Sequence, residues 1–166
     1  MNSLRVAGID PGSNKTGYAF IEVSGRVLQP LSFGVISTSR FKELPDKIAH
    51  IHLKLGELLD TFKPEEAAVE DIFHHKNAVS AFKLGQARGA VLLTLALRNI
   101  KVFSLPPAVV KKSIAAHGAA DKRQVRSMVC AVLRLDKPPP IDASDALAVA
   151  VTHARTLGLR TLQGRQ

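Results

Sequence analysis

Four acidic side chains stand at places in the sequence where they can form one catalytic site. Asp10 follows an apolar run near the N-terminus, and Glu70 follows a second apolar run in the middle of the chain. Asp142 and Asp145 are three residues apart, and residues at that spacing share one face of a helix. If the two apolar runs form neighbouring strands that end at the same edge of a sheet, all four carboxylates meet there.

Such a cluster has a specific chemistry. Carboxylates held close together repel one another, so the cluster destabilises the fold unless a cation compensates it. Hard oxygen ligands favour magnesium or manganese over zinc. Two such ions, about 3.5–4 Å apart, can activate a water molecule and stabilise the leaving oxygen of an in-line phosphoryl displacement. The four acids therefore predict metal-dependent phosphoryl transfer.

Most of these acids also have a plain structural explanation. Asp10 precedes Pro11 and Gly12, where it can be a turn residue. Asp142 can be the N-cap of a helix after a run of prolines, and Asp145 then lies in a first turn that favours negative charge. Glu70 has no capping role to explain it. The combination of all four is stronger than any one of them.

Strand-like and helix-like segments alternate along the chain. Short turns alone separate the first three strands, which predicts an antiparallel meander, whereas the last two strands alternate with helices. The sequence therefore predicts an α/β protein with a mixed five-stranded sheet flanked by helices, as a single domain over residues 1–158 with a short tail at 159–166. The predicted strands cover residues 4–9, 16–23, 27–37, 67–69 and 101–105; the predicted helices cover 44–62, 77–97, 106–118, a segment capped by Asp121, and 142–157, which Gly158 should end.

Positive charge is concentrated in the C-terminal part of the chain. The net charge is +9, and residues 98–166 carry 12 Lys and Arg against 4 Asp and Glu, a net charge of +8. A basic half on a small protein is typical of binding to a polyanion, most often a nucleic acid. The longest apolar run, 89–97, is far shorter than the ~20 residues of a membrane span, so we expect no membrane contact. The single Cys130 favours a buried thiol in a reducing cytoplasm.

The predicted helix over residues 77–97 is apolar on most sides. Gly85 and Gly89 lie four residues apart on one face, where another backbone can approach closely. One face of a sheet cannot cover so much apolar surface, so we expect this helix to contact a second copy of the chain. Deeper burial within the same chain is the alternative, and the two can coexist.

Four groups of residues, in the same order along the chain, resemble the motifs of RuvC-type crossover junction endodeoxyribonucleases. Together the matches extend from residue 4 to about residue 155, which makes them far more specific than the first motif alone. The matching segments are Gly8-Ile-Asp-Pro-Gly-Ser13 with Thr16-Gly17-Tyr18, Val69-Glu70 with Phe73 and Lys76-Asn77, Lys83-Leu-Gly-Gln-Ala-Arg-Gly89, and Asp142-Ala-Ser-Asp-Ala-Leu-Ala148 with Thr152-His153.

The resemblance implies a ribonuclease-H-like fold and a homodimer that cuts four-way (Holliday) junctions symmetrically in DNA recombination and repair. It implies 5′-phosphate and 3′-hydroxyl ends, and catalytic, metal-binding acids at Asp10, Glu70, Asp142 and Asp145. It further implies Mg²⁺ as the cofactor, replaceable by Mn²⁺, with two ions in each active site. The expected partners are four-way junction DNA and a branch-migration complex of the RuvA and RuvB type, in the bacterial cytoplasm at the nucleoid.

Resemblance and position together give seven candidate DNA-binding residues. Lys122 and Arg123 follow the cap Asp121, where cations oppose the helix dipole at a cost of about 0.3–1 kcal/mol each. A helix N-terminus also suits phosphate, so this unfavourable placement indicates function. An aromatic residue at position 73 stacks on DNA bases in the family, whereas burial in the core is the alternative; for Lys111 the alternative is a solvated helix face. The candidates are Phe73, Lys76, Lys83, Arg88, Lys111, Lys122 and Arg123.

Three other functions were weighed against the nuclease. An Asp-x-Gly turn after a first strand also opens the actin/hexokinase ATPase fold, but that fold needs two such subdomains and more than 166 residues. A catalytically silent nucleic-acid-binding module would not need acids at all four positions. A YqgF-type nuclease shares the fold and acts on RNA, but the segment Lys83–Gly89 and the basic C-terminal half favour the junction enzyme.

Overall fold

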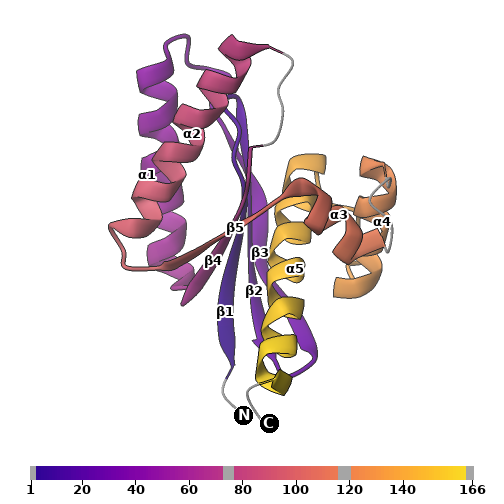
Figure 1. Cartoon of the computed structure of the whole chain (residues 1–166). Helices are drawn as coiled ribbons and strands as arrows, with labels where there is room; N and C mark the ends of the chain where they lie inside the picture. Colours follow the sequence, from indigo (N-terminus) through magenta and orange to yellow (C-terminus); the bar gives the residue numbers. More distant parts are fainter. Residues whose placement is uncertain (1–2, 73–76, 116–120, 164–166) are drawn as a thin grey trace.

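A twisted five-stranded sheet lies between two layers of helices (Figure 1). The computed structural model describes residues 3–72, 77–115 and 121–163 of the chain. The strand order is β3-β2-β1-β4-β5, with β1, β2 and β3 antiparallel and with β4 and β5 continuing from β1 in parallel. This topology confirms the predicted mixed sheet. The strands are β1 (Leu4–Asp10), β2 (Lys15–Ser24), β3 (Val27–Ser37), β4 (Glu66–Glu70) and β5 (Lys101–Leu105).

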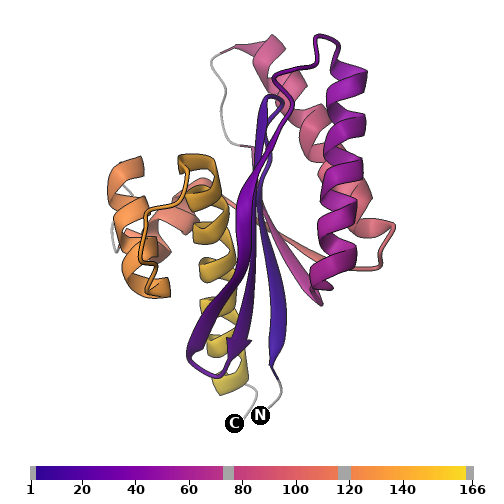
Figure 2. The same ribbon diagram turned by 180° about the vertical axis from the view of Figure 1, so that it is seen from behind.

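The helices divide between the two faces of the sheet. In Figures 1 and 2, α1 (Leu44–Phe62) and α2 (Ala78–Ala96) cover one face, and the three C-terminal helices cover the other. Those three are α3 (Pro107–Ala115), α4 (Lys122–Leu133) and α5 (Ile141–Gln163). Across the described residues, none of these helices combines the length with the apolar character that crossing a membrane requires.

Local sequence signals explain several helix ends. Asp121 accepts a hydrogen bond from the backbone of Gln124, whose side chain accepts one from the backbone of Asp121, so the predicted cap of α4 is a complete capping box. Asn77 caps α2 by accepting hydrogen bonds from two backbone amides. Helix α1 ends at Lys63, which is left-handed and precedes Pro64.

Each face of the sheet has its own hydrophobic core. Alternate residues of a strand point to opposite faces, and both sets are buried here because helices cover both faces. One core joins the sheet to α1 and α2, and the other joins it to α3, α4 and α5. The first contains Ile9, Phe20, Ile51, Leu55, Val69, Val91 and Leu95, and the second contains Val6, Ile21, Ala68, Val129, Leu147, Ala150 and Val151.

Two glycines bring α5 unusually close to the sheet. A Cβ atom added at Gly8 of β1 would overlap the backbone carbonyl of Ala146, and one added at Gly17 of β2 would overlap the carbonyl of Asp142. Only glycine allows a neighbouring backbone to approach so closely. The first turns of α5 therefore lie directly beside the end of β1, where Asp10 stands.

A buried polar pair ties the other end of α5 to β4. The imidazole Nε2 of His153 lies 2.7 Å from Oε2 of Glu66, and only 1% of His153 is exposed. The ring of Phe103 on β5 packs against the imidazole at 4.4 Å between ring centroids. This pair fixes α5 against β4 at the edge of the sheet opposite Asp10.

The predicted end of the last helix at Gly158 is wrong, because α5 continues to Gln163. A glycine inside a helix costs only about 1 kcal/mol relative to alanine, and the residues that follow it contain no proline. The first five residues of the predicted tail, 159–163, are thus helical.

Candidate active site

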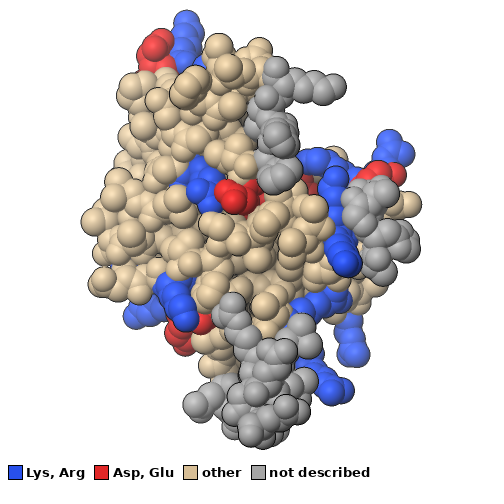
Figure 3. Space-filling view, in the orientation of Figure 1, with Lys and Arg blue, Asp and Glu red and all other residues tan. Residues whose placement is uncertain are grey.

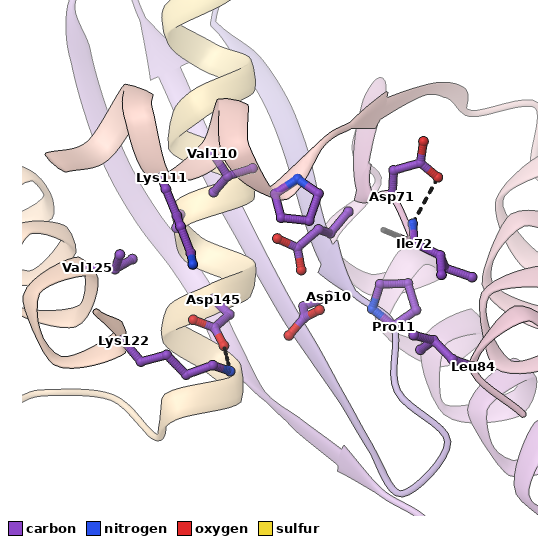
Figure 4. A pocket seen from close by; sticks show the side chains of 13 residues that line it. Asp10, Pro11, Asp71, Ile72, Leu84, Val110, Lys111, Lys122, Val125 and Asp145 are labelled. Carbon is purple, nitrogen blue, oxygen red and sulfur yellow. Dashed lines mark hydrogen bonds and ion pairs between the residues drawn. The ribbon is translucent and has the colours of Figure 1, made fainter. Parts of the chain in front are cut away.

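Three of the four predicted acids line one cavity. Asp10 is the last residue of β1, Glu70 is the last residue of β4, and Asp145 lies near the start of α5. The cavity has a volume of about 310 Å³, and Lys111 and Lys122 approach it from α3 and α4. In Figure 4 the carboxylates of Asp10 and Asp145 point into the space between the sheet and these two helices.

The topology explains why these acids meet. Strands β1 and β4 are parallel neighbours, so their carboxyl ends reach the same edge of the sheet. Helix α5 packs on the same strands and begins at that edge, with its first turns held close by Gly8 and Gly17. The first and fourth strands are thus neighbours, as convergence of the acids required.

The acids strongly perturb one another. Burial, followed by the charge and hydrogen bonding of Glu70, raises the pKa of Asp10 to about 8. Burial also raises the pKa of Glu70, with Asp145 adding to the effect, while a hydrogen bond from Asp10 opposes it. At neutral pH the Asp10–Glu70 pair therefore retains a proton unless a cation replaces it.

Lys122 supplies the nearest positive charge. Its ammonium lies 2.8 Å from Oδ2 of Asp145, and this hydrogen bond raises the pKa of Lys122, with Asp10 and Asp142 adding smaller electrostatic contributions (Figure 4). The side chain of Lys122 extends from α4, is largely exposed, and donates this hydrogen bond through its ammonium group. Asp145 is thus already paired with a cation.

Asp142 lies at the rim and does not line the cavity. Oδ2 of Asp142 is 4.0 Å from the ammonium of Lys15, the first residue of β2. About a third of the Asp142 side chain is exposed. The shared helix face predicted for Asp142 and Asp145 places them on the same end of α5, but their carboxylates have different partners.

The donor set suits a hard divalent cation. Asp10, Glu70 and Asp145 offer carboxylate oxygens only, and the raised pKa values of the first two show that their negative charge is poorly compensated. Within residues 3–72, 77–115 and 121–163, no three Asp, Glu, His or Cys side chains are arranged as a ready-formed metal site. Asp145, which now bonds the ammonium of Lys122, would have to turn toward the metal to coordinate it.

The predicted DNA-binding residues occupy different environments. Lys111 and Lys122 line the cavity, and Arg123 and Lys83 are exposed on α4 and α2. Arg88 is different, because its guanidinium already contacts protein groups and only 16% of its side chain is exposed. Phe73 and Lys76 lie outside the described residues.

Two residues of the site were not singled out from the sequence. Lys15 pairs with Asp142, and Asp71 follows Glu70 and forms an ion pair with Arg88 at 3.2 Å. Asp71 had a signal, because it is an acid adjacent to the catalytic candidate Glu70. Lys15 had none, since a lysine in a polar turn is ordinary.

A sheet of this topology with acids at the ends of its first and fourth strands and at the start of its last helix defines a nuclease of the ribonuclease-H-like class. Comparison with known proteins is specific. The model of the family "Crossover junction endodeoxyribonuclease RuvC" matches residues 6–153. The chain belongs to the RuvC family.

Relatives and solved structures agree with this assignment. The RuvC of Mannheimia succiniciproducens is 43% identical over 92% of this chain and 76% of its own length, and that of Xanthobacter autotrophicus is 42% identical over 95% and 94%. The structure of T. thermophilus RuvC with a Holliday junction substrate is 36% identical, covers 95% of this chain and 97% of its own, and has a TM-score of 0.88. A yeast mitochondrial Holliday junction resolvase, 15% identical with a TM-score of 0.69, covers 96% of this chain and 83% of its own and shares the fold.

Proposed function

We propose that this chain is a structure-selective DNA endonuclease that resolves four-way junctions in recombination and repair by paired, symmetric phosphodiester hydrolysis. The observation that carries the proposal is the cavity in which Asp10, Glu70 and Asp145 meet under an incompletely compensated negative charge. The family assignment supports it, since the T. thermophilus relative is found in complex with a Holliday junction. By the same resemblance, the products carry 5′-phosphate and 3′-hydroxyl ends.

The proposed cofactor is Mg²⁺, with Mn²⁺ as a substitute and two ions in each site. Asp10, Glu70 and Asp145 are its ligands, and Asp142 joins them from the rim. When bound, such ions activate a water molecule and stabilise the leaving oxygen. A bound cation would also offset the burial and the neighbouring negative charge that raise the pKa values of Asp10 and Glu70.

The cations around the cavity are proposed to hold the DNA backbone. Lys122 reaches across the cavity from α4, so the same ammonium that contacts Asp145 can contact a phosphate docked at its mouth. Lys111, Arg123 and Lys83 extend this basic surface, and Figure 3 shows Lys and Arg side chains gathered on the side of α3 and α4. By resemblance, Phe73 is proposed to stack on bases near the crossover and Lys76 is proposed as a further DNA-binding residue; both lie outside the described residues.

We further propose that two copies of the chain pair through α2. Large apolar side chains are exposed on this helix and beside it, and Figure 3 shows few charges over α1 and α2. The four on or next to α2 are separated by 3, 11 and 4 residues, spacings that put them in one stripe on a helix, and Gly89 leaves open space around its α-carbon. A homodimer would cover the stripe and supply the two active sites that paired incision needs. The exposed residues are Val79, Phe82, Leu93 and Leu97, with Leu53 on α1.

A charged residue introduced into the apolar stripe tests whether the dimer forms through α2. Phe82 is 74% exposed, so Phe82→Glu should leave the protomer folded and yield monomers in sedimentation experiments. Val27, which is 67% exposed on the opposite part of the sheet, supplies the matched control Val27→Glu, which should remain dimeric. A dimer unaffected by Phe82→Glu would place the interface elsewhere.

The expected setting is the bacterial cytoplasm at the nucleoid, beside branch-migration proteins of the RuvA and RuvB type. This part of the proposal rests on family resemblance. Co-purification with a RuvA–RuvB–junction complex, compared with the same complex on linear DNA, measures it directly.

The activity is tested with a synthetic immobile four-way junction. We expect two symmetric incisions with Mg²⁺ or Mn²⁺, no cutting with a chelator, and little cutting of a linear duplex of the same sequence. The products should be sealed by a DNA ligase, which requires 5′-phosphate and 3′-hydroxyl ends. Cleavage of structured RNA with the junction left intact would instead support a YqgF-type activity.

A further inference from the structure

Arg88 makes three contacts at the end of β4. Its Nε donates a hydrogen bond to the backbone carbonyl of Glu70 at 3.3 Å, and one Nη donates to Oγ of Ser104 at 2.7 Å. The same Nη lies 3.2 Å from Oδ1 of Asp71. These partners are the last residue of β4, the residue after it, and the second-last residue of β5.

The contacts hold the backbone at the point where Glu70 leaves the sheet. The amide of Asp71 donates to the carbonyl of Leu105 at 2.9 Å and so extends the β4–β5 ladder beyond Glu70. Asp71 also accepts a hydrogen bond from the amide of Ile72 at 3.0 Å (Figure 4). The guanidinium of Arg88 therefore holds the backbone on the C-terminal side of Glu70, whose carboxyl group lines the cavity.

The geometry suits arginine and not lysine. A guanidinium is a planar fork with fixed donors, so one group can bond a carbonyl, a hydroxyl and a carboxylate in defined directions. An ammonium is a point charge on a flexible stem and cannot span the same three partners. Only 16% of the Arg88 side chain is exposed, whereas Lys83, five residues earlier on α2, is exposed.

We propose that Arg88 is a positioning residue that sets the orientation of Glu70 in the cavity, and that it does not contact DNA. The inference rests on the proposed junction cleavage and replaces the DNA-binding role that the motif Lys83–Gly89 suggests for Arg88. Its physical basis is that Nε and one Nη already bond groups on β4 and β5, which holds the guanidinium against the sheet with only 16% of the side chain exposed.

Junction binding without divalent metal separates the two roles. A DNA contact adds about 0.9 to the slope of log K against log salt for each phosphate neutralised. We expect Lys83→Gln to lower this slope by about that amount, whereas Arg88→Gln should leave it unchanged. A lower slope for Arg88→Gln would overturn the proposal.

Single-turnover cleavage at saturating protein provides the second readout. We expect Arg88→Lys to reduce the rate at least about 30-fold, equivalent to about 2 kcal/mol, and to raise the Mg²⁺ concentration needed for half-maximal cleavage. Arg98→Lys, the same change at an arginine that pairs with Asp60 and does not line the cavity, should cut at the wild-type rate. A wild-type rate for Arg88→Lys would overturn the proposal, since lysine can replace arginine at a phosphate but not in this fork.

Partner variants distinguish positioning from folding. Ser104→Ala and Asp71→Asn each remove one contact of Arg88, and we expect both to lower the cleavage rate in the same direction with an unchanged salt slope. A variant that lowers only the melting temperature, with normal cleavage and metal dependence of the folded protein, would show a merely structural contact. If the wild-type protein does not cut junctions at all, the proposed function fails, whereas the Arg88 proposal fails only when the wild type cuts.

Discussion

The two ends of the contact between α5 and β4 are built from opposite chemistry. Glu66 and Glu70 are four residues apart on β4 and therefore lie on the same face of the sheet, about 13 Å apart along the strand. Asp145 and His153 are about two turns apart on α5, about 12 Å along the helix axis. The spacing matches, so Glu66 meets His153 at one end while Glu70 and Asp145 meet at the other.

The difference lies in how charge is compensated. At the Glu66 end, an acid bonds an imidazole that is 1% exposed, and the pair holds the helix on the sheet. At the Glu70 end, acids share a cavity in which burial, with the nearby charge of Asp145 adding to it, raises the pKa values of Asp10 and Glu70, and the ammonium of Lys122 bonds Asp145. The first end therefore stabilises the fold, and the second stores repulsion that a bound cation can relieve.

The largest predicted effect comes from a substitution at the Glu70 end. Asp10→Asn should lower junction cleavage by about 10³-fold, because metal-ion catalysis supplies several kcal/mol and about 4 kcal/mol is a factor of 10³ in rate. Junction binding should persist, and the metal-free protein should become more stable at neutral pH, because the buried carboxyl that must take up a proton on folding is lost. Single-turnover assays and urea unfolding measure the two effects.

Asp121→Asn is the matched control for that variant. It removes one negative charge near the same cavity, and Asn caps a helix as well as Asp does. Cleavage within a few-fold of wild type is expected. Comparable loss in both variants would mean that overall charge matters and not the position of Asp10.

The Glu70 end was largely predictable from the sequence. An acid directly after an apolar run is a local pattern, and a meander followed by parallel crossovers has few possible arrangements, so Asp10 and Glu70 could be placed together. The different partner of Asp142 could not, because residues three apart share a helix face and nothing in the sequence shows that Lys15, at the start of β2, lies beside one of them.

The stabilising end was not predictable. His153 lies 87 residues from Glu66, and a single histidine on an apolar helix gives no indication of its partner. The inward direction of Arg88 was hidden for the same reason, since tertiary packing determines which flank of α2 is covered. Gly158 is a weaker case, in which helix-forming neighbours outweighed a local stop signal.

The next largest effect tests the stabilising end. His153→Ala should lower the free energy of unfolding by about 2–4 kcal/mol, because it leaves a cavity beside Phe103 and a poorly solvated Glu66 without this partner. Cleavage by the folded fraction should remain close to wild type. His52→Ala is the comparison, because His52 bonds Thr94 between α1 and α2 at 2.8 Å but is less buried, and a smaller loss is expected.

The pH dependence of stability separates the two ends further. Asp10 has a pKa of about 8 in the folded protein and an ordinary pKa of 3.8, so between these values the folded state binds more protons than the unfolded state. The metal-free protein should therefore lose stability as pH rises from 4 to 8, by at most about 1.4 kcal/mol per pH unit from this group, and level off above. Urea unfolding at several pH values should show a shallower decline for Asp10→Asn. Parallel curves would indicate that Asp10 is not the group responsible.

Magnesium should give the smallest effect, an increase in melting temperature that depends on the acids of the Glu70 end. A ligand at five times its Kd stabilises a protein by about 1 kcal/mol, which for a chain of this size raises the melting temperature by about 2–4 °C. We expect this shift in the wild type and in His153→Ala, but a smaller shift in the double variant Asp142→Asn/Asp145→Asn. Since His153→Ala disturbs α5 at its other end, retention of its magnesium shift would show that the two ends act separately. Loss of the shift in His153→Ala would instead mean that the buried pair helps to position the acids, and equal shifts in all three proteins would argue against a metal site in the cavity.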